Sequence, residues 1–412
     1  MKEKFEKLLL ENTIMDTDEF MKKYNPWEQE RATHLINNYL KIMDKENESN
    51  YFTGNFNYDS ESFSWLAIEE DLENKYLKTD KRKKFPENIH YGLPNQVHGD
   101  IDKATIFQCL LNPNIALEDK KRNKRNKKSP APKNLEDFFR KFEVTNTGDL
   151  SAHFSNYSNE EKIKEHIVDT ESSMLKKELI QLINLEKSEI NELMSGVKKL
   201  RNRFYYLGEY FYPLLTRDNI NAQVLQKLKK ELIKEENYNV IKENAKKLKT
   251  CNLEVFPFRS KKPKLGFSDE NFGRELVETE ADTVLLSARI ILRRIALYLH
   301  QNISNDVQPM FIFRRYDLVW KNLIKTVLKN DYKVSDEDIR EMLKEIEDEY
   351  FYFFTSRSVG RNGKRNQSSG KISKDNLKKS DNSLSKCERR LEESEFLDLK
   401  IKHGTLILED ND

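Results

Sequence analysis

Thr105-Ile106-Phe107-Gln108-Cys109-Leu110-Leu111 runs directly into Asn112-Pro113-Asn114. The run is apolar apart from Thr105 and Gln108, and turn-forming residues bound it on both sides. A short apolar run with such boundaries predicts a strand buried on both faces, as in a parallel sheet. In open α/β sheets, ligands bind beyond the carboxyl ends of the strands. We therefore expect functional chemistry at Asn112-Pro113-Asn114.

Three more segments predict strands: Cys251–Phe256, Pro309–Phe313 and Tyr350–Phe354. Amphipathic helical patterns separate them, the clearest at Asp282–His300 and after Ser335, which is placed as a helix cap. Strands that alternate with helices indicate an α/β fold with right-handed crossovers. We expect a short, mostly parallel sheet of four strands.

The rest of the chain divides by composition into flanking parts. Residues 1–85 predict an N-terminal helical region, with Asn25-Pro26 as a helix start. Residues 86–118 and 203–412 form the expected α/β core, and its tail, Phe396–Leu408, predicts an edge strand or hairpin. Residues 119–202 and 216–249 are highly charged and predict a helical insertion, which begins with a basic loop and includes a short helix at Asn134–Val144.

The composition excludes several classes of protein. The 412 residues include only three cysteines, far apart and without a CxxC pair, so we expect no disulfide scaffold, zinc site or iron–sulfur cluster. The N-terminus lacks an apolar signal core, and no apolar run of membrane-spanning length occurs. The motifs of nucleotide, dinucleotide and zinc-protease sites are absent. We expect a cytoplasmic protein with no metal, no cofactor and no membrane contact.

Positive charge is concentrated in two segments. Asp119–Lys133 and Arg357–Lys379 each hold eight Lys or Arg residues and one acidic residue, whereas the whole chain carries only +2. Two basic loops on an otherwise acidic body indicate a surface for a polyanion. The alternative is that both are solvated lysine-rich loops.

Val97–Asn114 resembles the first motif of the uracil-DNA glycosylase superfamily, in particular the branches with Asn-Pro-Gly after the first strand. Asn252–Phe256, ending in Pro257-Phe258, resembles the base-reading strand of that family. Tyr350–Phe354 with Thr355–Leu377 occupies the place of the loop that wedges into the duplex. The resemblance covers roughly 90–118 and 203–380, less the insertion. It implies a three-layer sandwich and hydrolysis of an N-glycosidic bond in DNA, with the base flipped out.

The resemblance implies that Asn112 holds the attacking water. A neutral amide can orient water, which suffices when the base departs first and the sugar becomes oxocarbenium-like. Asp100 and Asp102 are the candidates for activating water if Asn112 does not. Pro113 and Asn114 are expected to border the base, although Asn114 replaces the glycine of the family. The alternative is that Asn-Pro only ends the strand.

The resemblance also implies two base-binding residues on the second predicted strand. Glu254 falls where an Asn usually reads the pyrimidine edge. A carboxylate only accepts hydrogen bonds, so it favours the N4 amine of a cytosine-derived base over uracil. Phe258 is placed to stack on the flipped base. The alternatives are an exposed edge residue for Glu254 and a core side chain for Phe258.

Arginine and lysine side chains provide the expected contacts to DNA phosphates. The wedge segment lacks the histidine that the family often uses to stabilise the departing base, so arginines are expected to supply positive charge instead. The expected DNA-binding residues are Lys120, Lys121, Arg122, Arg125, Arg314, Arg315, Arg357, Arg361 and Arg365.

The leading hypothesis is a DNA glycosylase that removes a modified, cytosine-derived base, for example in antiphage defence. The second is a nucleic-acid-binding or interaction protein that keeps the fold without catalysis and docks a protein partner through the helical insertion. The third is a nuclease, for which no paired-carboxylate metal motif is visible. Fold analogy alone does not decide among them.

Overall fold

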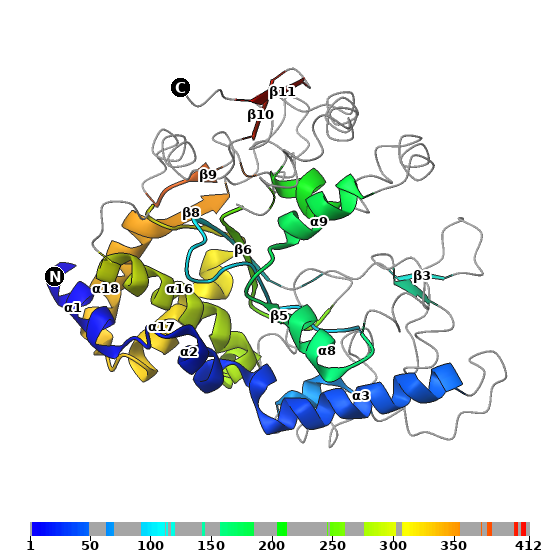
Figure 1. The fold of residues 1–412 in the computed structure, drawn as a ribbon. Coiled ribbons are helices and arrows are strands. Elements are labelled where there is room, and N and C mark those ends of the chain that lie inside the picture. The colour runs from blue at the N-terminus through cyan, green and yellow to red at the C-terminus, as the bar shows by residue number, and fades with distance from the viewer. Residues whose placement is uncertain are drawn as a thin grey trace, which may run out of the picture.

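The computed structural model describes residues 2–48, 63–69, 92–111, 113, 117–119, 142–144, 157–184, 204–211, 245, 248–259, 276–301, 307–354, 372, 377–380, 399–402 and 405–408. Within them the fold is α/β, with a mixed sheet and several helices (Figure 1). The α-helices are α1 (Lys2–Asn12), α2 (Thr17–Tyr24), α3 (Glu30–Glu48), α8 (Glu160–Ile167), α9 (Met174–Ile183), α16 (Asp282–Gln301), α17 (Trp320–Asn330) and α18 (Asp336–Tyr350). Short 3-10 segments are η1 (Pro26–Glu28), η2 (Trp65–Ile68) and η5 (Tyr316–Leu318), and η4 (Leu207–Phe211) is a π-helical turn.

The main sheet has the strand order β5-β1-β6-β2-β7-β8-β9 in the described residues. Its strands are β1 (Val97–His98), β2 (Ile106–Leu110), β5 (Val168–Asp169), β6 (Thr250–Glu254), β7 (Met310–Phe313), β8 (Phe351–Phe354) and β9 (Leu377–Lys378). The four predicted strands are β2, β6, β7 and β8, and they lie side by side and parallel.

The expected sheet of four strands is nevertheless too small. β1 pairs antiparallel with β6 and parallel with β5, and β9 pairs antiparallel with β8, so the sheet is mixed and seven-stranded. Each added strand has two residues and contains a polar or charged side chain. Such strands have no apolar run by which a sequence pattern can detect them.

The two faces of the sheet differ in polarity. Phe107, Cys109, Cys251 and Leu253 join one continuous core with α16, α17 and α18. The alternate residues face the other way, where the Oδ1 atom of Asn252 accepts a hydrogen bond from the first residue of α9 at 3.0 Å. This second face therefore carries polar side chains beneath α9.

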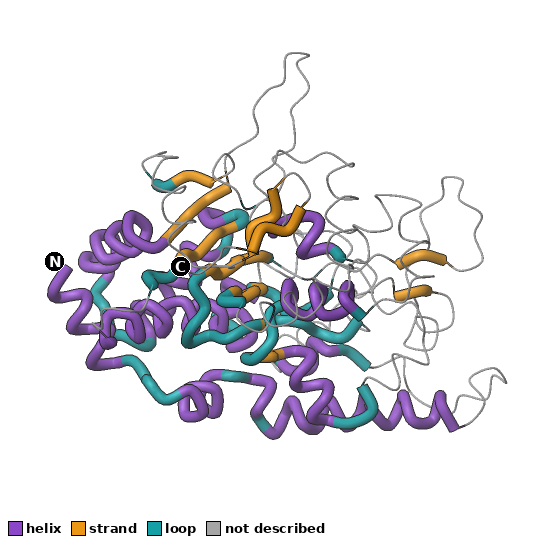
Figure 2. The backbone as a smooth tube through the Cα atoms, turned by 45° about the horizontal axis from the view of Figure 1, so that its top comes forward, coloured by secondary structure: helices purple, strands orange, loops and turns teal. Residues whose placement is uncertain are grey.

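The N-terminal helices share the main core. Phe5 and Leu9 of α1 and Phe20 of α2 are buried in the same cluster as α16. Asn25 caps η1 as predicted, because its Oδ1 atom accepts a hydrogen bond from the N–H of Trp27 at 3.1 Å. Figure 2 shows these helices bordering the sheet on the side that carries the N-terminus. The described part of residues 1–85 is thus helical and built onto the α/β core.

Part of the predicted insertion belongs to the main sheet. Residues 157–184 contribute α8, β5 and α9, with Ile163, Ile167 and Leu175 buried. Phe142–Val144, expected in a short helix, is instead β4 and pairs with β3 (Leu117–Asp119). The predicted C-terminal hairpin is confirmed as β10 (Leu399–Lys402) and β11 (Thr405–Leu408). None of the described helices combines the length and apolar composition that a membrane crossing requires.

Candidate functional site

The strand order contains a reversal at the centre of the sheet. In chain order, the parallel strands β6, β2, β7 and β8 read second, first, third and fourth. The connection from β2 leads to β6 on one side, and the connection from β6 then crosses to β7 on the other side. Such a reversal is a topological switch point, where ligands bind beyond the carboxyl ends of the strands.

The segments that follow β2 and β6 run side by side. The N–H of Val255 donates to the carbonyl of Leu110 at 3.3 Å, and the N–H of Phe256 donates to Leu111 at 2.8 Å. From β7, the N–H of Arg314 donates to the carbonyl of Cys109 at 3.0 Å. Three strands thus deliver their next residues to the same edge.

Glu254 is the buried acid at this edge. It is 2% exposed, and its Oε2 atom has no hydrogen-bond partner within the described part of the chain. Burial raises the pKa of Glu254 well above its usual range, while the charges of Arg259 and Arg314 act in the opposite direction. Burial thus favours the protonated form of this carboxyl group, which can donate as well as accept a hydrogen bond.

Arg259 and Arg314 bring positive charge near Glu254. Arg259 is 8% exposed, and its Nε atom donates to the carbonyl of Leu93 at 2.7 Å. The guanidinium of Arg314 lies 5.1 Å from the ring centre of Tyr210 and 5.8 Å from that of Phe354. These aromatic contacts hold a half-buried cation at the end of β7.

Tyr205, Tyr206 and Tyr210 at η4 pack against one another, and Tyr210 also contacts Arg314. The hydroxyls of Tyr205 and Tyr210 are 3.1 Å apart, and Tyr206 is buried with its pKa raised by burial and by the nearby acids. Glu178 of α9 anchors this segment, because its oxygens accept from the N–H groups of Tyr206 at 2.9 Å and Leu207 at 2.6 Å. Burial raises the pKa of Glu178 to about 8.

A row of polar side chains continues from β2 to the β5 edge beneath α9. The Nδ2 atom of Asn252 donates to the Oε1 atom of Gln108 at 2.6 Å, and Asn252 pairs across the strands with His98. Lys177 of α9 lies 2.9 Å from the Nδ1 atom of His98 and 2.8 Å from a carboxylate oxygen of Asp169. Burial and the Lys177 charge lower the pKa of His98, so its ring is neutral.

The arrangement suits recognition of a flat, polar molecule. A protonated acid supplies one donor and one acceptor, the arginines supply positive charge, and the tyrosines supply aromatic surface. The described residues contain no group of three or more His, Cys, Asp or Glu side chains placed to hold a metal ion.

Several predicted site residues lie outside the described residues. They are Asn112, Asn114, Lys120, Lys121, Arg122, Arg125, Arg357, Arg361 and Arg365. Among the other predicted residues, Pro113 is buried after β2, and Glu254 and Arg314 lie at the carboxyl ends of β6 and β7, where the Arg314 charge lowers the pKa of Glu254 against the effect of burial. Arg315 is exposed, with a left-handed backbone (φ 57°) before η5.

Asp100 and Asp102 lie at the opposite edge of the sheet. They precede the amino end of β2, where the Oδ1 atom of Asp100 accepts from the N–H groups of Asp102 and Lys103, each at 2.9 Å. Asp102 also forms an ion pair with Arg293 and accepts a hydrogen bond from Thr17. Their structural contacts and their position separate both carboxylates from the Glu254 edge, so neither is placed to activate water there.

Phe258 is also not available for stacking on a base. It is fully buried and belongs to the same apolar core as α16. The aromatic surface at the site comes from the tyrosines around η4, which the sequence presents only as an aromatic-rich segment. Arg259 and Glu178 were likewise missed, because they reach the site through long-range packing that leaves no local pattern.

The chain was compared with protein-family models, with curated proteins and with solved structures. None of the three comparisons gives a match.

Proposed function

We propose that this chain is a DNA glycosylase-like hydrolase with a three-layer sandwich core, acting on a flipped, cytosine-derived base. The proposal is carried by one observation. The segments that follow β2 and β6, far apart in the sequence, run side by side at the carboxyl edge of the sheet. Leu111, which directly precedes the Asn112-Pro113-Asn114 motif in the sequence, and Glu254 therefore lie at one edge.

Burial favours the protonated form of Glu254, and this form recognises a base differently from a carboxylate. A carboxylate accepts only and selects the N4 amine of cytosine, whereas a protonated acid donates to one atom and accepts from another. The protonated acid pairs with the N3 and N4 positions of cytosine, and it also fits the N3–H and O4 positions of uracil. Discrimination in favour of cytosine-derived bases then rests on the ionised form and increases with pH.

In the proposed reaction the base leaves first and carries negative charge. The chain lacks the wedge histidine of the family. Among the described residues, Arg314, which lies against Tyr210 and Phe354, takes its role in stabilising that charge. A half-buried guanidinium stabilises developing negative charge more strongly than a solvated one. Asn112 orients the water that attacks the sugar, and the basic loops hold the DNA backbone.

The test is an abasic-site assay. DNA with uracil, DNA with modified cytosines and phage genomic DNA are incubated with the protein and then treated with alkali. We expect strand cleavage on a modified-cytosine substrate, a loss of about a hundredfold or more for Asn112→Ala, and a clear loss for Glu254→Leu, which removes both the donor and the acceptor. Glu337→Leu, at an exposed position on α18, is the matched control. Full cleavage by Asn112→Ala would exclude the proposed mechanism.

The second candidate is a nucleic-acid-binding protein without catalysis, with the helical insertion as its contact to a protein partner. Asn114 in place of glycine and the lack of histidine in Thr355–Leu377 favour it. It is distinguished by salt-sensitive DNA binding that Asn112→Ala leaves unchanged, with no abasic product from any substrate.

A further inference from the structure

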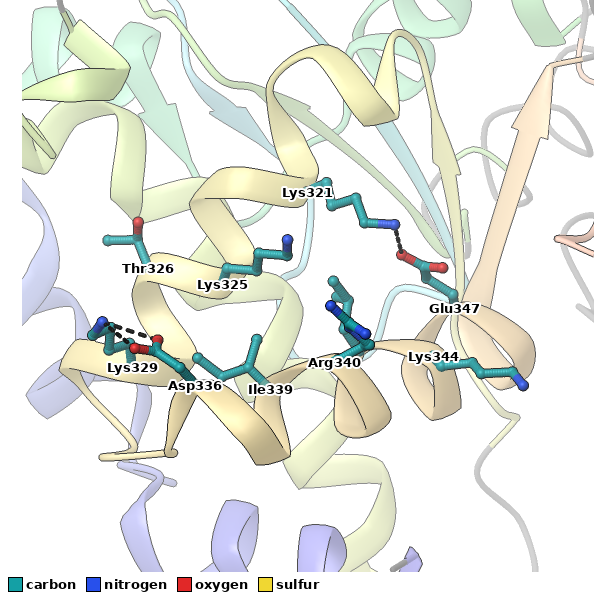
Figure 3. Close-up of a pocket in the computed structure, with 10 residues that line it drawn as sticks. Lys321, Lys325, Thr326, Lys329, Asp336, Ile339, Arg340, Lys344 and Glu347 are labelled. Atoms are coloured by element: carbon teal, nitrogen blue, oxygen red, sulfur yellow. Dashed lines mark hydrogen bonds and ion pairs between the residues drawn. The ribbon is translucent and has the colours of Figure 1, made fainter.

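A groove of about 480 Å³ lies between α17 and α18, away from the residues of the proposed base site (Figure 3). Both helices contribute basic side chains to it: Lys321, Lys325 and Lys329 from α17, and Arg340 and Lys344 from α18. The three lysines are spaced four residues apart, so they lie on one face of α17.

An ion pair closes each end of the groove. Lys329 contacts both oxygens of Asp336 at 2.9 Å, and Lys321 contacts Glu347 at 3.0 Å. The lysines of these two pairs are separated by two helical turns of α17, which is about 12 Å along the axis. The open part of the groove is therefore short.

The middle of the groove holds cations from both helices. Lys325 from α17 and Arg340 from α18 lie between the two ion pairs, while Lys344 points away from them (Figure 3). No carboxylate in the described part of the chain forms an ion pair with Lys325 or Arg340. Like charges that line one groove destabilise a helix pair unless an anion lies between them.

The composition of α18 shows that this arrangement is not forced by a lack of acids. The helix Asp-Glu-Asp-Ile-Arg-Glu-Met-Leu-Lys-Glu-Ile-Glu-Asp-Glu-Tyr has eight acidic residues and only two basic ones. Both basic residues, Arg340 and Lys344, line the groove, and six of the eight acids do not. A single acidic residue at position 340, in place of Arg340, would have neutralised Lys325 within the protein.

We propose that this groove is a binding site for a compact oligophosphate anion, such as the diphosphate or triphosphate group of a nucleotide. Two or three phosphate groups fit the open length between the ion pairs, and Lys325 and Arg340 reach them from both sides. An extended nucleic-acid strand would have to pass the exposed Asp336 and the acidic outer face of α18. The apolar lining residues, Ile339 and Leu343, are buried, so they offer no exposed apolar surface to a protein partner.

The test is calorimetric titration of the full chain with inorganic tripolyphosphate at low salt. We expect one site per chain, with affinity that falls as salt rises. The double variant Lys325→Met/Arg340→Met is expected to weaken binding by about tenfold or more. Each single variant is expected to show a smaller loss. The control is Lys22→Met/Lys103→Met, which removes the same charge from exposed positions elsewhere and should bind as the wild type does.

Two outcomes would overturn the assignment. Equal weakening by the double variant and the control would mean that only the overall charge matters. A single-stranded oligonucleotide that binds as tightly as tripolyphosphate, with the same loss in the double variant, would assign the groove to a nucleic-acid backbone instead. The abasic-site assay of the double variant separates this site from the proposed function, because base removal should remain at the wild-type level.

Discussion

At Glu178 a carboxyl group with 7% residue exposure accepts hydrogen bonds from the N–H groups of Tyr206 and Leu207. Burial raises its pKa from 4.5 to about 8. Between these values the unfolded chain releases the proton while the folded chain keeps it. The contribution of Glu178 to the free energy of unfolding is therefore fully present below pH 4.5, and it is lost as the pH rises toward 8.

We expect this titration to be visible in the pH dependence of unfolding. The free energy of unfolding should fall by up to about 1.4 kcal/mol for each pH unit within that window because of Glu178 alone. Glu178→Gln should flatten the slope, whatever its effect on absolute stability. Chemical denaturation at a series of pH values measures it, with the exposed Glu171→Gln as control. A wild-type slope in Glu178→Gln would show that Glu178 is ionised in the folded protein.

Gly99 shows a second residue-scale constraint. Its φ is +119°, and a Cβ atom added there would lie 2.2 Å from the carbonyl oxygen of Thr250 and 2.9 Å from the Cα atom of Cys251. Both obstacles are backbone atoms of β6, which cannot move without breaking the β1–β6 pairing.

Gly99→Ala should therefore destabilise the protein by about 3 kcal/mol or more, from strain and overpacking together. The measurement is urea denaturation followed by circular dichroism. Lys103→Ala, an exposed position in the adjacent turn, should stay within about 0.5 kcal/mol of the wild type. Equal stability of the two variants would mean that the β1–β6 edge adapts to the added methyl group.

At the scale of elements, α18 depends on a predicted cap. The Oγ atom of Ser335 accepts a hydrogen bond from the N–H of Asp338 at 3.2 Å. Ser335→Ala should cost about 1 kcal/mol because it leaves a helix N–H without this partner, and Ser335→Asn should restore most of the loss. Thermal unfolding of the three proteins measures the difference, and an equal loss in both variants would show that the hydroxyl is not acting as the cap.

The elements that the sequence predicts are those whose signal is local. β2, β6 and β7 are buried and β8 is buried in its first half, so apolar side chains and turn boundaries mark these strands. β1 and β5 exist because Val97 and His98 meet Val168 and Asp169 across a long stretch of chain. Two-residue strands of this composition are stabilised by pairing and by nothing in their own sequence. The sequence therefore predicts the centre of the sheet and misses its edges.

The candidate site also divides into local and long-range residues. Glu254 can be found in the sequence because it lies within the predicted strand Cys251–Phe256, and Arg314 because it follows another predicted strand. Glu178 and Arg259 cannot be found in this way, since their partners, Tyr206 and Leu93, come close to them only in the folded chain. Asp100 and Asp102 have the right chemistry for catalysis but lie at the amino edge, which sequence proximity to β2 does not reveal.

At the scale of the whole molecule, a buried cation joins the N-terminal helices to the α/β core in addition to their shared apolar packing. Arg293 of α16 is 1% exposed, and its guanidinium donates to the carbonyls of Ile14 at 2.9 Å and Met15 at 2.6 Å. It also donates to the hydroxyl of Thr17 at 3.0 Å and forms an ion pair with Asp102. One side chain thus ties the α1–α2 connection to both α16 and the turn before β2.

Arg293→Lys should weaken this attachment while keeping the charge. An ammonium group lacks the planar fork, so it cannot reach two carbonyls, a hydroxyl and a carboxylate together, and buried acceptors are left unpaired. We expect a loss of about 3 kcal/mol in the free energy of unfolding. Hydrogen exchange should speed up first in α1 and α2 and stay slow in β2, β6 and β7. Arg315→Lys, at an exposed position, should change neither quantity. Uniformly faster exchange across helices and sheet in Arg293→Lys would show that the N-terminal helices and the sheet unfold only as one unit.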